Sequence, residues 1–186
     1  MTSTKLESGQ DVVAFLIQQH QQIKDLFAQV SETAGDERRE AFTVLRRSLA
    51  VHETAEEEIV HPRARQVLDD GDDVVDARLQ EENEAKQTLA ELEKLDVDSA
   101  QFETLFRELQ ADVLLHAAAE EEQEFVELAA QLDGEQLDRM RNAVQLAESM
   151  APTRPHPGVE SAKANMLAGP FAAMLDRARD LLSGKS

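Results

Sequence analysis

Residues 52–62 read HETAEEEIVHP, and residues 116–126 read HAAAEEEQEFV. In both stretches a histidine is followed, four positions later, by the first of three glutamates. Residues four apart lie on the same face of an α-helix, so His52 would adjoin Glu56 and His116 would adjoin Glu120. The repeat therefore predicts two helices that each present a histidine and a carboxylate side by side.

Sequence breakers separate six segments rich in helix-forming residues. The separators include AGDE at 34–37, DDGDD at 69–73, LDVDS at 95–99, DGEQ at 133–136 and APTRPHPG at 151–158. The helices are expected over about 10–33, 37–69, 73–95, 100–132, 135–150 and 159–183. This pattern predicts an all-α fold, an antiparallel up-down four-helix bundle with two additional C-terminal helices. Residues 1–132 would form the bundle, and residues 133–186 a C-terminal helical extension packed on or beside it.

Composition limits the classes of function. The chain of 186 residues has no cysteine and a formal net charge of -19, so thiolate catalysis, iron–sulfur clusters and cysteine zinc sites are excluded. Nucleic acid and anionic membranes are polyanions, so neither is expected as a partner, whereas a cation is favoured. No secretory signal is visible, nor an apolar run near the roughly 20 residues of a membrane span. We therefore expect a cytoplasmic protein.

Ionisable residues lie on the apolar faces of three predicted helices. At about 100° per residue, apolar side chains surround His20, His52 and His116 on their helices. Glu56 and Glu120 lie one turn beyond two of these histidines. A single buried histidine is more often a hydrogen-bonded core residue than a ligand. Three histidines and two carboxylates are costly to bury together unless a cation neutralises them, so their convergence predicts a metal site.

The helix expected over 73–95 contains no histidine. Its apolar stripe passes within about 20° of Glu82, which is therefore the expected inward carboxylate, with Glu81 in reserve. The alternative is that QEENE at 80–84 is a solvated surface.

The other glutamates of the two triplets fall off the core stripes by the same calculation. They are expected to face solvent, with at most one shielding the entrance to the site: Glu57, Glu58, Glu121 and Glu122. His61 lies about 180° from His52 on the helical wheel, so it is expected outside the bundle core as a packing or surface residue. His156, in the proline-rich loop, is expected to be structural.

This arrangement resembles the hemerythrin-like proteins, the family with the HHE cation-binding domain. That family has a histidine on the first helix, His-x3-Glu on the second, a histidine on the third and His-x3-Glu, or His-x4-Asp in the oxygen carriers, on the fourth. Over about residues 10–132, the matching positions are His20, His52, Glu56, His116 and Glu120. The tail after Gly134 resembles the C-terminal extension of some actinobacterial members.

The resemblance implies a cofactor of two non-heme iron ions, oxo- or hydroxo-bridged and joined by Glu56 and Glu120, with manganese or zinc as substitutes. It also implies reaction with dioxygen, hydrogen peroxide or nitric oxide. Two departures stand out. Glu82 or Glu81 would replace the missing third-helix histidine, which favours oxidised metal over reversible oxygen carriage. His61 stands where the family commonly has tyrosine, which this chain lacks, and is kept as a reserve ligand.

Three functions are compatible with these residues. The first is a di-iron enzyme of oxidative or nitrosative stress defence, catalase- or peroxidase-like. The second is an iron or oxygen storage or sensing protein without catalytic turnover, and the third an acidic helical bundle whose histidines bind nothing. The expected partners are small molecules, and the chain is expected to be a monomer or a homodimer.

Overall fold

The structure, a computed structural model, describes residues 11–151. This part of the chain is helical and has no strand, and its elements are α1 (Val12–Glu32), α2 (Gly35–Ala55), η1 (Glu56–Val60), α3 (His61–Val67), α4 (Gly71–Leu92), α5 (Ala100–Ala119), η2 (Glu120–Glu124), α6 (Phe125–Gln131) and α7 (Gly134–Glu148). The label η marks a π-helical segment. The predicted all-α class is confirmed for the described residues, and the helix limits lie within three residues of those expected. The helix expected over 159–183 and His156 lie outside the described residues.

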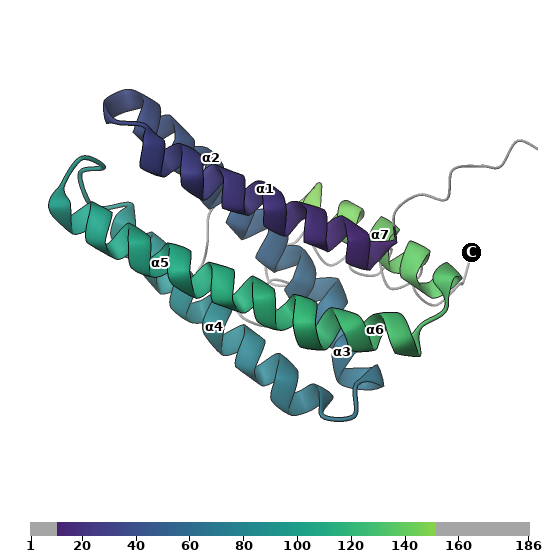
Figure 1. Cartoon of the computed structure of the whole chain (residues 1–186). Coiled ribbons are helices and arrows are strands. Elements are labelled where there is room, and N and C mark those ends of the chain that lie inside the picture. Colours follow the sequence, from purple (N-terminus) through teal and green to yellow (C-terminus); the bar gives the residue numbers. More distant parts are fainter. Residues whose placement is uncertain (1–10, 152–186) are drawn as a thin grey trace, which may run out of the picture.

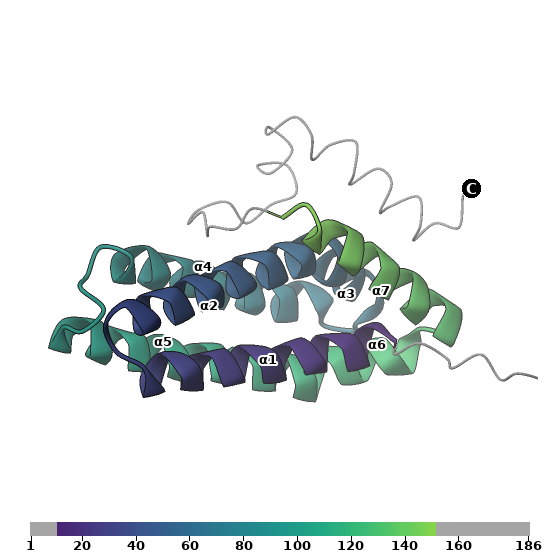
Figure 2. The same ribbon diagram turned by 90° about the horizontal axis from the view of Figure 1, so that it is seen from above.

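The long helices form two antiparallel pairs. α1 pairs with α2, α4 pairs with α5, and the two pairs lie side by side (Figures 1 and 2). α2 continues through η1 into α3 without a loop, and α5 continues through η2 into α6. α7 packs against α1, α2 and η1 at the end of the molecule opposite the α1–α2 turn (Figure 2). Among the described helices, none combines the length and apolar character needed to cross a membrane.

Two N-terminal helix caps fix the starts of α1 and α7, and one glycine allows α3 and α4 to lie close together. Asp11 caps α1 by accepting a hydrogen bond from the backbone nitrogen of Ala14 at 2.9 Å, and Asp133 opens α7 in a capping box with Gln136. At Gly71 a Cβ atom would lie 2.8 Å from the carbonyl oxygen of Ala64. Only glycine permits this approach, which brings α3 close to the first turn of α4.

The core consists of two apolar clusters, one toward each end of the bundle. One contains Leu16, Ile59 and Phe125 and includes apolar residues of α7; the other contains Phe27, Leu49 and Leu109. Along α1, His20 comes between the residues of the two clusters, and the other helices show the same order. A layer of ionisable side chains therefore crosses the middle of the bundle, shielded from water at both ends.

Candidate metal centre

Six side chains from both helix pairs converge in this middle layer. They are the six main candidates from the sequence: His20 on α1, His52 on α2, Glu56 at the start of η1, Glu82 on α4, His116 on α5 and Glu120 at the start of η2. All are buried except His116, which is partly buried. The core orientation predicted for Glu82 is correct, since its side chain is 1% exposed.

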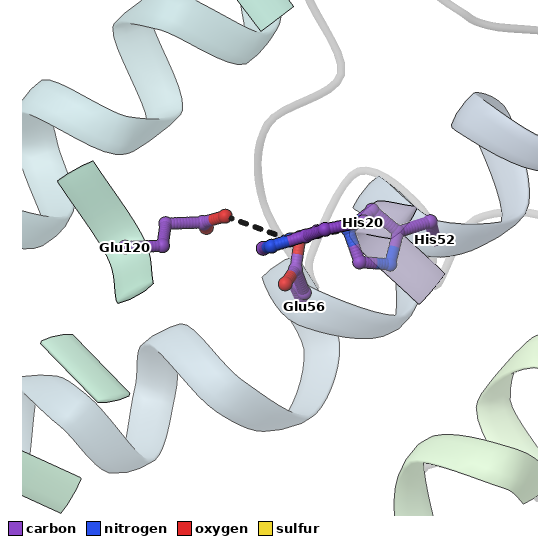
Figure 3. Close-up of side chains that lie close together, drawn as sticks. All are labelled: His20, His52, Glu56 and Glu120. Atoms are coloured by element: carbon purple, nitrogen blue, oxygen red, sulfur yellow. Dashed lines mark ion pairs between the residues drawn. The ribbon is translucent and has the colours of Figure 1, made fainter. Parts of the chain in front are cut away.

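The ligand atoms form two overlapping groups. One group is His20, His52, Glu56 and Glu120, and the other is Glu56, Glu82, His116 and Glu120, each with its ligand atoms within 4.8 Å of one another. Figure 3 shows the four side chains of the first group close together, with Glu120 paired with His20, and Glu56 pairs with His52. Glu56 and Glu120 belong to both groups, so each would lie within reach of an ion held by either group.

Each of the three histidines is oriented by a hydrogen bond at Nδ1. The partner is Glu121 for His20 at 2.8 Å, Gln19 for His52 at 3.0 Å and Glu81 for His116 at 2.8 Å. The opposite atom, Nε2, then faces the shared carboxylates, 3.4 Å from Glu120 for His20 and 3.3 Å from Glu56 for His52. Metal-binding histidines show this pattern, because a partner at one nitrogen fixes the lone pair of the other.

The donor set fits a metal ion. Several buried ligand atoms have no hydrogen-bond partner in the described part of the chain: Nε2 of His20 and His116, both carboxylate oxygens of Glu56 and Glu120, and Oε2 of Glu82. Buried polar atoms without partners are costly, and a cation bound among them would offset this cost. Imidazole nitrogen together with carboxylate oxygen suits iron, manganese or zinc.

The prediction that His61 lies outside the bundle core is wrong. His61 is 1% exposed, and its Nε2 and Nδ1 lie 2.7 Å from Glu82 and 3.1 Å from Glu124. The cause is the π-helical segment η1, which inserts one extra residue into the turn that begins at Glu56. Every later side chain is rotated back by about 100°, so His61 lies roughly 80° from His52 instead of 180°.

The prediction for two glutamates of η1 is also wrong. Glu57 and Glu58 were expected to face solvent, yet both are 6% exposed. In the second copy of the motif, Glu122 is exposed as expected, and Glu121, which holds His20, is partly exposed. Glu124, which the sequence did not single out, is fully buried, and with His61 and Glu120 it forms a third group of possible ligand atoms.

The sequence model of the hemerythrin HHE cation binding domain matches residues 11–129. The chain belongs to this family. A protein of Nostoc sp. (strain PCC 7120 / SAG 25.82 / UTEX 2576) named DNA nickase is 26% identical over 141 residues, which cover 75% of this chain but only 39% of that protein. No solved structure matches the chain significantly.

Within the HHE domain, the two shared carboxylates differ in their preference for a proton. Burial and the nearby charge of Glu120 raise the pKa of Glu56 well above its ordinary value. Burial acts in the same direction on Glu120, but His116 and His20 outweigh it and hold the pKa of Glu120 well below its ordinary value. Burial and His20 lower the pKa of His52 to about 3, so His52 stays neutral, the form that binds metal.

A buried lysine lies beside the metal-ligand candidates of the HHE domain. Lys86 is 4% exposed, pairs with Glu57 and lies 3.7 Å from Oε2 of Glu82. Sequence reasoning missed Lys86, although its position four residues after Glu82 placed it on the same helix face. Burial raises the pKa of Glu57 to about 9, and that of Glu53, one residue from His52, to about 8.

A cavity of about 210 Å³ adjoins the middle layer of the HHE domain. Its lining combines His20, His52 and His116 with apolar side chains such as Ile23 and Val113 and with Asp112, which is exposed. A small molecule can therefore reach the histidine side of the cluster from solvent.

The metal-free chain is expected to lose stability as the pH rises from 7 to 9. Glu53 and Glu57 keep their protons in the folded chain up to pKa values of about 8 and 9, whereas the ordinary value is 4.5. The pKa values of His61 and His116 are also raised, because nearby carboxylates outweigh the effect of burial. Since the folded chain binds more protons than the unfolded chain in this window, the free energy of unfolding falls with pH.

The slope is roughly 1.4 kcal/mol per pH unit for each such proton. Urea unfolding at pH 7, 8 and 9 measures it, and Glu57→Gln, which stays neutral throughout, should flatten the dependence. A free energy of unfolding that is constant or rises over this window would contradict these protonation states.

Proposed function

We propose that this HHE-domain protein is a non-heme di-iron protein that reacts with dioxygen, hydrogen peroxide or nitric oxide in oxidative or nitrosative stress defence. The observation that carries the proposal is the pair of overlapping ligand groups sharing Glu56 and Glu120. Two-ion sites built in the core of helix bundles use this plan, with carboxylates from facing helices between the ions. In this proposal the domain organisation is a metal-binding four-helix bundle over residues 1–132 and a helical extension over residues 133–186.

Each side chain has a role in this proposal. His20 and His52 would hold one ion, Glu82 and His116 the other, and Glu56 and Glu120 would lie between them. Bound iron would supply one-electron redox chemistry and Lewis acidity toward small oxidants.

The protein supplies access and orientation around these ligands. The 210 Å³ cavity reaches the centre from the histidine side, where a small reactant would enter. Glu121, Gln19 and Glu81 keep the three rings turned inward. Lys86 and His61 lie against the two oxygens of Glu82 and limit its rotation. Glu81, a reserve ligand by sequence, has the role of orienting His116 in this proposal.

The nature of the second ligand group supports reaction over reversible oxygen carriage. Glu82 gives it an anionic oxygen where the family commonly has a histidine nitrogen, and harder, anionic donors favour oxidised metal. Catalase- or peroxidase-like turnover is therefore proposed ahead of storage or sensing without turnover, which remains the second candidate.

The net charge of the chain bears on the proposed partners. The relative from Nostoc is named a DNA nickase, but a net charge of -19 repels DNA, so no nucleic acid is proposed as a partner. We propose small-molecule partners, a monomer or homodimer, and a cytoplasmic location.

Peroxide decomposition by the iron-loaded protein tests the enzymatic claim. The loaded chain should show an iron(III) charge-transfer absorption and decompose hydrogen peroxide faster than the same concentration of free iron. The variant Glu122→Gln, at an exposed position of the same triplet, is the matched control and should behave like the parent chain. Iron loading without turnover above free iron would exclude the enzyme and leave the storage or sensing protein.

A further inference from the structure

α7 lies beyond the residues that the family model matches, yet one of its side chains reaches toward the candidate metal centre. The matched region ends at residue 129, whereas α7 spans Gly134–Glu148. The helix packs on α1, α2 and η1 (Figure 2). In its last turn, the carboxylate of Glu148 accepts a hydrogen bond from Nε2 of Gln19 on α1.

Gln19 connects Glu148 to a ligand histidine. The amide oxygen Oε1 of Gln19 lies 3.0 Å from Nδ1 of His52. An amide oxygen only accepts hydrogen bonds, so Nδ1 of His52 must carry the proton. The lone pair of His52 is then on Nε2, which faces Glu56 at 3.3 Å in the candidate centre.

The direction of the Gln19 amide depends on Glu148. A glutamine side chain is a donor at one end and an acceptor at the other, and rotation by 180° exchanges them. While it is ionised, the carboxylate of Glu148 only accepts hydrogen bonds, so it holds the NH₂ end of Gln19 and leaves the oxygen for His52. A cavity of about 150 Å³, which Gln19, His52 and Glu148 line together, leaves room for the amide to rotate when Glu148 is removed.

The other two ligand histidines need no such support. Nδ1 of His20 and of His116 meets a carboxylate directly, Glu121 or Glu81, at 2.8 Å in each case. A carboxylate is an acceptor in either orientation. Of these three histidines, His52 is therefore the one whose protonated nitrogen is decided by a residue beyond its immediate partner.

We propose that Glu148 is a positioning residue for the metal centre. Through Gln19 it holds His52 with the proton on Nδ1 and the lone pair on Nε2, so α7 completes a site whose ligands all lie in the HHE domain. The inference rests on the proposed metal site for its consequence, while the protonation of His52 can be measured in the metal-free chain.

Competition between the full-length chain and a chelator for Zn²⁺, a redox-silent probe, tests the proposal. Glu148→Leu should weaken Zn²⁺ binding by about tenfold, the lower end of the effect of losing an outer partner of a ligand histidine. Glu148→Gln retains an acceptor oxygen and should restore most of the affinity. Glu135→Leu, at an exposed position in the first turn of α7, is the matched control and should bind like the parent chain.

A double-mutant cycle and a spectrum separate positioning from general stabilisation. Glu148→Leu should have no further effect on Zn²⁺ affinity once Gln19→Leu is present, because the two residues act in series. In ¹⁵N NMR spectra of the metal-free chain, the His52 ring should be protonated on Nδ1 in the parent and lose this preference in Glu148→Leu.

The outcomes distinguish the two proposals. Unchanged affinity in Glu148→Leu, additive effects in the cycle, or an unchanged His52 ring would each overturn the positioning role. A parent chain that binds no Zn²⁺ and no iron would overturn the metal site, while the NMR spectra would still decide whether Glu148 controls His52.

Discussion

Glu120→Gln is expected to abolish the binding of both ions of the proposed metal centre. The carboxylate of Glu120 is fully buried and is common to both groups of ligand atoms. Glutamine keeps the size of the side chain but removes its charge and replaces one ligand oxygen with an NH₂ group. Because neither ion keeps its full ligand set, the affinity for metal should fall by more than about 100-fold. Losing only a residue that hydrogen-bonds to a ligand lowers metal affinity by at most about that factor.

Metal content after dialysis against a competing chelator measures this loss. Glu122→Gln provides the control, since it makes the same chemical change two residues away, at an exposed position of the same π-helical segment. The control should retain both ions. Equal retention of metal by Glu120→Gln and Glu122→Gln would show that Glu120 is not a ligand.

His61→Leu is expected to cause a large loss of stability in the metal-free chain. His61 lies between Glu82 and Glu124, both buried, and these carboxylates raise its pKa well above the ordinary value against the opposing effect of burial. At neutral pH the histidine is therefore a buried cation between two acidic groups. Removing one partner of a buried ion pair typically costs about 3–5 kcal/mol, because the remaining charge is left uncompensated.

Urea unfolding of the metal-free chain at neutral pH measures the effect, with the exposed neighbour Gln66→Leu as the control for an added apolar side chain. The control should change the free energy of unfolding by less than about 0.5 kcal/mol, as surface substitutions usually do. A loss of that small size in His61→Leu would contradict the buried position of His61 between the two carboxylates and would favour the location outside the bundle core that the sequence predicts.

Along the continuous stretch from α2 to α3, the wrong predictions begin where the π-helical segment η1 begins. His20, His52, Glu82 and His116 lie in regular α-helix, where about 100° per residue places them correctly. Glu56 begins η1 and so precedes the extra residue of that turn.

After Glu56 the calculation places His61 on the wrong side of the helix. Glu57 and Glu58 are also buried, whereas Glu121 and Glu122 at the equivalent positions of η2 are partly or fully exposed, so the π-helical turn alone does not account for their burial. The two repeats do carry a shared signal, because η1 and η2 both begin at the first glutamate of the triplet. However, the periodicity of apolar residues does not reveal a π-helical turn.

Tertiary contacts account for what the sequence could not indicate. Gln19 is rotated by about 100° from His20 on α1. Its amide can contact His52 only because α2 packs beside α1. Glu148 contacts Gln19 across 129 positions of the sequence, a separation that no local pattern reports. The fold class, by contrast, follows from composition and breakers alone, because long amphipathic helices joined by short loops pack antiparallel.

Anaerobic equilibrium titration of the metal-free chain with Fe²⁺ against a competing chelator tests the proposed di-iron centre most directly. We expect two tightly bound ions per chain in the parent, and none of comparable affinity in the double variant His52→Ala, His116→Ala, which removes a nitrogen ligand from each group. Binding of no iron by the parent, or of equal iron by the parent and the double variant, would contradict a di-iron centre at this site.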